Sequence, residues 1–525
     1  MDISGGVLGA IVLAIIVAAF ARWRGWGVAL PLLGAGVIIG FLPFGPTAPE
    51  NAGEVFLLIL APLVFGEALS ASFIDIRRFR RPILALAIGL VVVSSAAVGA
   101  VAQAVVPALP LSLAFALGAI LSPTDAVAVA SVAKRAALPR SIVTILEGES
   151  LVNDGTGLTL LRVALAAAAA GAFSAGEVLL VLAQSVLGGI VVGAAVGFAL
   201  VWVMRHTRDD LIVNCLILIV PFPVYLIAEE IGGSGILAVV AAALIIANQM
   251  LSDRRFRGRM ASVAVWRQIT FILSAFAFFL VGMEIPSTLE ALSGEDRARL
   301  PVLVISVLVT LFLARALFVL AMVLLTRRSS GERLRLREAV VLAWAGARGP
   351  VSGLAAFSLP VAVGGIGLLP ERNLLLATTF LVIAATLLLA PTLGPVAKLV
   401  RLTRDADEGH TRDLQAALAA RGLEALDRAV EQGYLDHAPY EHEAEHAVRD
   451  RLIASLHPDA AADPAAPEGL LASQVWQLER AVIIAQQEEL LRLRDEEGMP
   501  DALVRPVMHE LDLQLAALNT RKPQS

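Results

Sequence analysis

EGESLVNDGTGL, residues 147–158, places three acidic side chains inside a run that is otherwise apolar enough to cross a bilayer. A carboxylate at membrane depth costs about 2.5–3.5 kcal/mol on insertion scales, so it persists only where it faces other protein or a water-filled cavity. On a helix, Ser150 and Asp154 share one face, and Glu149 and Asn153 share the neighbouring face. This spacing predicts an ion or proton site centred on Asp154. The simpler alternative is a polar contact that holds two helices together.

The composition around this stretch is that of a polytopic membrane protein. The chain has 525 residues, of which 58% are hydrophobic and 17% are charged, and its mean hydropathy is +0.79. Its apolar runs repeatedly exceed the length that spans about 30 Å of hydrocarbon. Charge divides the chain, because residues 1–400 have a net charge of +6 and residues 401–525 have −11. We therefore predict a transmembrane domain over 1–400 and a small helical tail over 401–525, in which a Pro/Ala-rich linker at 457–469 separates two helical pieces.

Thirteen apolar segments are candidate transmembrane helices, so the expected fold class is all-α. They are roughly 5–21, 26–42, 53–72, 83–106, 111–133, 142–170, 178–204, 211–229, 234–250, 264–285, 300–326, 338–359 and 373–397. Arginine and lysine residues gather in alternate loops, and by the positive-inside rule those loops are cytoplasmic. The N-terminus is then outside and the acidic tail is inside. No basic residue precedes the first apolar run, which favours a retained first helix over a cleaved signal peptide.

Thirteen spans divide into two units of six helices with a single helix between them, an arrangement that gives two repeats of inverted topology. The fifth and twelfth spans then correspond. Each contains a helix breaker beside a charge, Pro123 with Asp125 in the fifth span and Pro350 with Arg348 in the twelfth. An ordinary proline kink explains either break alone. Both together predict crossed broken helices around a midplane site, with Asp125 near helix N-termini and Arg348 near C-termini.

Four motifs in this order carry a resemblance to a known family: SPTDAVAV at 122–129, EGESLVNDGTGL at 147–158, FLVGMEI at 279–285 and GARGPVSGLA at 346–355. They resemble the sodium/proton exchangers of the monovalent cation:proton antiporter-1 family, with its bacterial NhaP-type members, over residues 10–400. The resemblance implies a homodimer in the plasma (inner) membrane that exchanges Na⁺ for H⁺. It implies no cofactor and no nucleic acid partner.

The resemblance also implies an ion site. Asp154 matches the carboxylate that binds the cation and carries the proton, and Ser150 matches a ligand on the same face. Thr124 and Asp125 match the contribution of the unwound fifth helix, and Glu67 matches an acidic residue that reaches the site in some members. The chemistry agrees, because a hard alkali cation prefers several oxygen ligands from carboxylates, hydroxyls and backbone carbonyls. Na⁺ is the expected metal ligand of Asp154, Ser150 and Thr124.

Other buried charges have structural interpretations. Glu149 and Arg348 match a buried ion pair that ties the sixth span to the twelfth. Arg162 and Arg315 are expected to bind acidic side chains or carbonyls at helix ends rather than substrate. Glu229 borders an outer loop and is expected to be solvated.

Competition between a proton and a cation for Asp154 is already an exchange mechanism, because burial favours the protonated acid and a bound cation favours the carboxylate. Asn153 cannot ionise, which predicts electroneutral one-for-one exchange by alternating access. A gated monovalent cation channel is the alternative from another functional class. The sequence leaves Na⁺, Li⁺ and K⁺ open as substrates. An enzyme is not expected, because the chain has no phosphate-binding GK[ST] loop and no hydrolase-type serine elbow.

Overall fold

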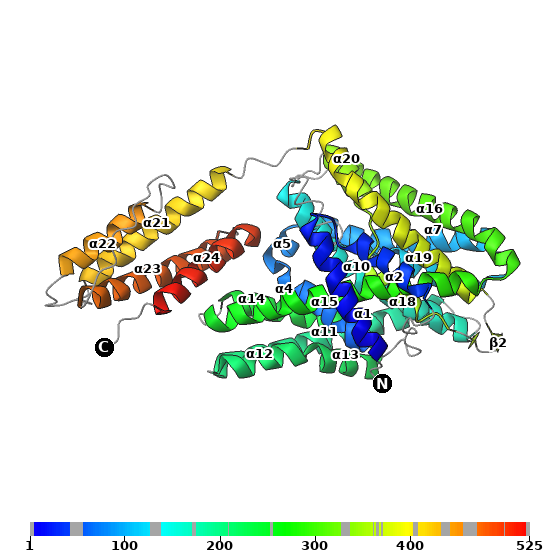
Figure 1. Cartoon of the computed structure of the whole chain (residues 1–525), viewed down its shortest axis with the longest axis horizontal. Coiled ribbons are helices and arrows are strands. Elements are labelled where there is room, and N and C mark those ends of the chain that lie inside the picture. Colours follow the sequence, from blue (N-terminus) through cyan, green and yellow to red (C-terminus); the bar gives the residue numbers. More distant parts are fainter. Residues whose placement is uncertain are drawn as a thin grey trace. The chain divides into compact units, whose positions relative to one another are not determined.

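The computed structural model describes residues 5–42, 56–125, 138–170, 175–207, 209–252, 256–326, 336–360, 362–363, 367–368, 371–402, 408–431, 441–454, 470–497 and 499–520. The chain divides into two compact units (Figure 1), one made of Met1–Gln249 with Ser262–Arg404 and the other of Met250–Ala261 with Asp405–Ser525. The described elements are helices apart from one antiparallel pair of two-residue strands, β1 (Ala362–Val363) and β2 (Gly367–Leu368). Ala362 lies opposite Leu368 and Val363 opposite Gly367 in this pair.

Helices of the N-terminal half overlap the predicted apolar segments, apart from one short helix at 73–78 that lies between two of them. They are α1 (Gly5–Trp23), α2 (Ala29–Gly40), the π-helical η1 (Phe56–Leu60), α4 (Ala61–Ser70), α5 (Phe73–Arg78), α6 (Arg80–Leu84), the π-helical η2 (Ala85–Leu90), α7 (Val91–Val105), α8 (Leu111–Leu121), α10 (Arg140–Ala170), α11 (Ala175–His206), α12 (Asp210–Ile219), α13 (Pro221–Glu230) and α14 (Gly235–Ser252). Pro221 marks the division between α12 and α13, because proline has no N–H to donate to the preceding turn.

The remaining helices of the apolar region are longer on average. They are α15 (Phe256–Glu290), α16 (Gly294–Thr326), α17 (Leu336–Trp344), α18 (Pro350–Ala356), α19 (Arg372–Leu389), the 3₁₀ turn η3 (Ala390–Thr392) and α20 (Leu393–Leu399). Every apolar segment predicted as a span contains a helix in the described residues.

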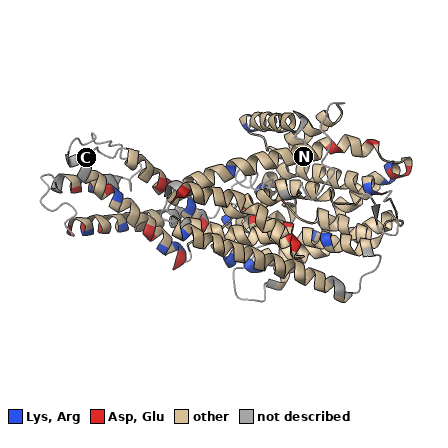
Figure 2. Ribbon diagram, turned by 90° about the horizontal axis from the view of Figure 1, so that it is seen from below, with Lys and Arg blue, Asp and Glu red and all other residues tan. Residues whose placement is uncertain are grey.

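Six helical segments of the described chain are long and apolar enough to cross a membrane by length and composition. They are Arg80–Val105, Leu179–His206, Asp210–Glu230, Met260–Glu290, Gly294–Leu325 and Arg372–Leu399. Five shorter apolar helices of 10–17 residues accompany them in the same part of the chain. Figure 2 shows these helices mostly free of charged residues, with a small number of charges inside the bundle. The protein is therefore an integral membrane protein with a helical fold.

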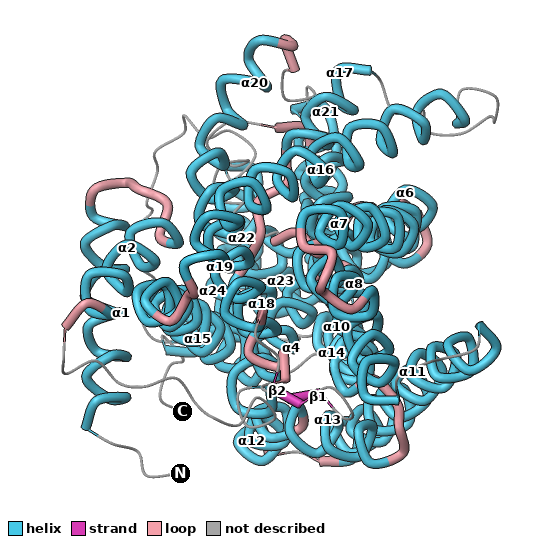
Figure 3. The backbone as a smooth tube through the Cα atoms, turned by 90° about the vertical axis from the view of Figure 1, so that its right-hand side faces the viewer, coloured by secondary structure: helices cyan, strands magenta, loops and turns pink. Residues whose placement is uncertain are grey.

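The site is positioned by a compact group of helices in which α8 packs against α7 and α10, and α16 packs against α7 and α17 (Figure 3). Their shared core is apolar and closely buried, with Leu117, Phe279 and Phe380 all fully enclosed. In this apolar core a charged side chain is stable only where it has a partner or contacts a water-filled space.

The C-terminal unit contains α21 (Glu408–Glu431), α22 (Glu441–Ala454), α23 (Leu470–Asp495) and α24 (Asp501–Thr520). The predicted helical tail is thus helical where it is described, and the predicted linker at 457–469 lies outside the described residues. Apolar side chains such as Leu478 and Val504 form its core. Arg494 and Asp501 are buried together, with Nε donating to Oδ1 at 2.9 Å.

Candidate ion-binding site

The first structural feature of the site is the end of α8. Ser122 turns its hydroxyl back to the Gly118 carbonyl at 2.6 Å, and Pro123 follows, so the helix stops at Leu121. Thr124 and Asp125 continue in non-helical backbone and are both buried. The predicted break in the fifth span is therefore present at these residues, and the segment 126–137 beyond it lies outside the described residues.

The second feature is the gap between α17 and α18. Residues 345–349 are not helical, and Pro350 stands at the first turn of α18, where its missing N–H costs no hydrogen bond. The Asp125 N–H donates to the Ala347 carbonyl at 2.9 Å, so the backbone of one break is hydrogen-bonded to the backbone of the other. Gly349 lies against the Asp125 side chain, and a Cβ there would be only 2.7 Å from Asp125 Cγ. The two breaks therefore lie against each other.

Charges at the breaks match the helix ends that they face. Arg348 Nε donates to the carbonyl of Leu121 at 2.9 Å, which is the C-terminal end of α8, and its guanidinium also donates to Gly346 O. Its backbone N–H donates to Thr386 Oγ1 at 3.1 Å. Asp125 lies beside Gly349, where α18 begins. A cation at a helix C-terminus and an anion at an N-terminus are each the favourable placement for the helix dipole.

A third element, α10, brings the acidic stretch to the breaks. Glu149, Ser150, Asn153 and Asp154 are all buried, with at most 5% of each residue exposed. Asn153 Nδ2 donates to Thr124 Oγ1 at 3.0 Å and to Thr124 O at 3.3 Å. Thr124 in turn donates to Glu149 Oε1 at 3.0 Å. These hydrogen bonds fix α10 to the break after α8.

The partner of Glu149 differs from the expected one. Arg315 of α16 donates from both terminal nitrogens to the two Glu149 oxygens, at 2.5 and 2.9 Å, and both side chains are 2% exposed. Arg315 Nε also donates to Leu342 O near the end of α17 at 2.8 Å. The prediction that Glu149 pairs with Arg348 is therefore wrong. Arg348 is engaged by the carbonyls of the helix ends, and the bidentate fork of Arg315 satisfies the carboxylate.

Glu67, on α4, completes the acidic group. It lies close enough to Asp125 and Asp154 for the three carboxylates, which come from three segments, to interact electrostatically. One acceptor in this region stands out: Asn153 Oδ1 is buried and has no hydrogen-bond partner among the described residues. Carboxylate, hydroxyl and amide oxygens around a shared space are the donor set that suits a hard monovalent cation.

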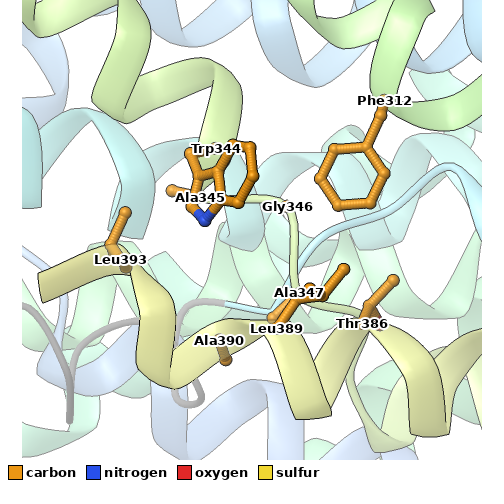
Figure 4. Close-up of a pocket in the computed structure, with 9 residues that line it drawn as sticks. All are labelled: Phe312, Trp344, Ala345, Gly346, Ala347, Thr386, Leu389, Ala390 and Leu393. Atoms are coloured by element: carbon orange, nitrogen blue, oxygen red, sulfur yellow. The ribbon is translucent and has the colours of Figure 1, made fainter. Parts of the chain in front are cut away.

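A pocket beside the second break is distinct from this acidic group (Figure 4). It is lined by Phe312, Trp344, Ala345, Gly346, Ala347, Thr386, Leu389, Ala390 and Leu393. None of the acidic side chains lines it. Trp344 Nε1 donates to Thr392 Oγ1 at 2.8 Å, which ties the end of α17 to the turn after α19.

Comparison with known proteins identifies the family of the chain. The model of the sodium/hydrogen exchanger transmembrane family matches residues 10–398. The chain belongs to the sodium/hydrogen exchanger family. This family consists of transporters rather than enzymes. The match confirms the resemblance found in the four sequence motifs.

Two relatives and one solved structure show how far the similarity extends. An uncharacterised Na⁺/H⁺ exchanger of Mycobacterium tuberculosis H37Rv is 32% identical, covering 97% of this chain and 96% of the relative. A sodium, potassium, lithium and rubidium/H⁺ antiporter of Bacillus subtilis is 33% identical, covering 69% of this chain and 56% of the relative. The sodium proton antiporter MjNhaP1 of Methanocaldococcus jannaschii aligns with a TM-score of 0.63 at 22% identity, over 75% of this chain and 98% of that structure, and it shows a shared fold.

The sequence predictions for two charged residues outside the acidic group, Arg162 and Glu229, are correct in part. Arg162 binds the Gly233 carbonyl at 2.7 Å and forms an ion pair with Glu229, so it contacts an acid and a carbonyl, as predicted for it and for Arg315. Glu229 is not simply solvated as expected. It is about one-third exposed and also accepts the Gly235 N–H at 2.9 Å. A glycine turn, with Gly232 at φ +77°, brings these groups together. The pair of glycines at 232 and 233 is the sequence feature from which this turn could have been predicted.

Proposed function

We propose that this exchanger moves Na⁺ and H⁺ in opposite directions and that Asp154 binds the two ions in turn. The observation that carries the proposal is the placement of Asp154 and Ser150 on a buried face of α10, next to the break after α8. Asn153 and Thr124 hold that break in place through hydrogen bonds of 3.0 and 3.3 Å. Unwound backbone offers carbonyl oxygens, and the nearby hydroxyls and carboxylates add oxygen ligands.

Each site residue then has a role. Asp154 supplies the titrating charge, and Ser150 and Thr124 supply hydroxyl oxygens to Na⁺. Asp125 and Glu67 keep the region negative, and the unpartnered amide oxygen of Asn153 is a further available ligand. Glu149 holds α10 against α16 and binds no cation, because Arg315 occupies both of its oxygens.

The stoichiometry is one cation for one proton. Asn153 carries no charge, Glu147 is exposed, and the charge of Glu149 is matched by Arg315, so Asp154 is the buried acid of α10 that remains to exchange its proton. Competition of the two ions for one carboxylate, with only the loaded site changing sides, gives electroneutral exchange. Na⁺ is the substrate we assign, with Li⁺ and K⁺ as further candidates, because the Bacillus relative is named for several alkali cations.

The molecular setting of this activity follows the sequence predictions. Thirteen spans form two six-helix repeats of inverted topology with crossed breaks at the fifth and twelfth, and alternating access moves the site between the two sides. The N-terminus is outside, the tail at 401–525 is a cytoplasmic regulatory domain, and the exchanger is a homodimer in the plasma membrane. The exchanger relatives support this assignment over a gated channel.

Flux measurements on purified protein in liposomes test the proposal. Asp154→Asn should abolish sodium-driven proton movement, because the amide carries no negative charge and does not exchange a proton with the cation. Asp209→Asn is the matched control, since Asp209 is an exposed helix cap whose role an asparagine can fill. Sodium-driven flux that survives in folded Asp154→Asn protein would overturn the site. A rate that changes steeply with an imposed potassium/valinomycin potential would overturn one-for-one exchange.

A further inference from the structure

Two hydroxyl groups on α15 are buried without a hydrogen-bond partner among the described residues. They are Thr270 Oγ1 and Ser274 Oγ. Ser274 is only 9% exposed, so its hydroxyl is enclosed by protein. The two residues are four apart and lie on one face of the helix. An unsatisfied buried hydroxyl is unfavourable, and two on one helix face call for an explanation.

Other hydroxyls on the membrane helices of this chain behave differently. Many of them bond to the carbonyl four residues earlier, and Thr386 bonds to the carbonyl three residues earlier, as a serine or threonine in an apolar helix can do without any other partner. The described examples are Ser95 to Val91, Ser122 to Gly118, Thr156 to Val152, Thr159 to Gly155, Thr310 to Ser306, Thr378 to Leu374 and Thr379 to Leu375. Thr270 and Ser274 do not use this option, so their oxygens are available to something else.

The strip of α15 that carries these hydroxyls contacts α4 beside Glu67. Thr270 Oγ1 lies against Gly66 of α4, where there is no space for a side chain, and the next residue is Glu67. Seven residues beyond Ser274 on the same face, Val281 packs against Gly353 of α18. At 3.6 residues per turn, the three α15 positions fall within about 40° around the helix axis. The hydroxyls therefore lie on the strip of α15 that runs from the helix of Glu67 to the helix that begins at the second break.

We propose that Thr270 and Ser274 form a coordination step for the transported cation on its way to the carboxylates. Their oxygens replace water ligands of a partly dehydrated monovalent cation as it passes α4, where Glu67 supplies the attracting charge. This inference rests on the proposed exchange function and adds a polar wall on α15 to the site. The ligand is an alkali cation, and the hydroxyls contribute neutral oxygens rather than a titrating group.

The test uses variants that remove the hydroxyl and keep the shape. Thr270→Val and Ser274→Ala in the full-length protein should each raise the KM for Na⁺ by about three- to tenfold, the loss that one neutral polar contact gives. The maximal rate and its pH dependence at saturating Na⁺ should be unchanged, because no proton-carrying group is altered. Thr270→Ser keeps an oxygen at the position and should restore a KM near that of the wild type.

Thermal melting separates this role from a structural one. Removing an unsatisfied buried hydroxyl should leave the melting temperature unchanged or raise it, whereas removing a structural contact should lower it. Thr310→Val, which deletes a hydroxyl that bonds to its own helix, is the matched control and should leave the KM alone. If the wild type exchanges Na⁺ and both α15 variants keep its KM, the inference is overturned and the proposed function stands. Absence of Na⁺-driven proton flux in the wild type would overturn both.

Discussion

Breaking the buried ion pair between Glu149 and Arg315 should destabilise the protein more than any other single charge removal in the membrane region that we consider. Both side chains are 2% exposed and share two hydrogen bonds, at 2.5 and 2.9 Å. Removal of one partner leaves the other charge buried without a counter-ion, which typically costs about 3–5 kcal/mol. Glu149→Ala and Arg315→Met should therefore each lower the free energy of unfolding by about that amount.

The double variant gives the sharper result. With both charges gone no ion is stranded, so the double variant should lose less than the sum of the two single losses. The coupling should approach the upper end of the range for residues in direct contact, about 3 kcal/mol. Unfolding titrations in mixed micelles, with helix content as the signal, would measure the three variants and the wild type.

A second double-variant series, Glu149→Ala with Arg348→Met, is the internal comparison. Arg348 donates to the Leu121 and Gly346 carbonyls rather than to Glu149, so the coupling in this series should be clearly smaller. Additive losses for Glu149 with Arg315, or a larger coupling with Arg348 than with Arg315, would refute the reasoning.

Further predictions concern one glycine and two carboxylates. Gly349→Ala should impair exchange and cost about 1–3 kcal/mol, because its Cβ would lie only 2.5 Å from Asp125 Cβ; wild-type flux and melting would contradict this. Glu229→Gln should cost no more than about 1 kcal/mol in unfolding titrations, because the ion pair with its α10 arginine is one-third exposed. In the tail, the hydrogen bond from Arg492 holds the pKa of Glu489 below its ordinary value. This bond stabilises the tail above the ordinary pKa of a glutamate, and its contribution is lost as pH falls through the lowered pKa of Glu489. In Glu489→Gln the melting temperature should therefore fall less steeply with decreasing pH than in the wild type.

Local chemistry explains why the breaks and the acidic stretch could be predicted from sequence. Pro123 and Pro350 each remove a backbone donor, which favours an interruption of the helix nearby. Pro286 and Pro301 lie inside continuous helices, so the charges beside the two breaks were needed for the prediction as well. Asp154 lies in a run whose burial follows from composition alone. Neighbouring residues in the sequence determine where α8 ends and where α18 begins. They also determine that Asp154 is buried.

Side-chain partners could not be predicted in the same way. Glu149 had two buried arginines within plausible reach, Arg315 and Arg348, and sequence spacing does not distinguish a residue on α16 from one in the gap between α17 and α18. Packing decides the pairing: α16 lies beside α17, and its arginine reaches Glu149 and Leu342 O together. The unpartnered hydroxyls of α15 could not be predicted for the same reason. Helical periodicity gives the face of α15 on which Thr270 lies, but it does not show that Gly66 of α4 packs against it.

The corrected pairing strengthens the argument for one-for-one exchange. With Arg315 on Glu149, a continuous series of contacts runs from α16 through Glu149 and Thr124 to Asn153, so each of these groups has a fixed structural partner. Asp154 has no arginine or lysine among the ion pairs of the described residues. A carboxylate without a fixed cation can be neutralised by a proton or by a transported cation, whereas one held by a guanidinium is already neutralised. The arrangement therefore concentrates the buried exchangeable charge of α10 on Asp154 and leaves Glu149 to hold the helices around it.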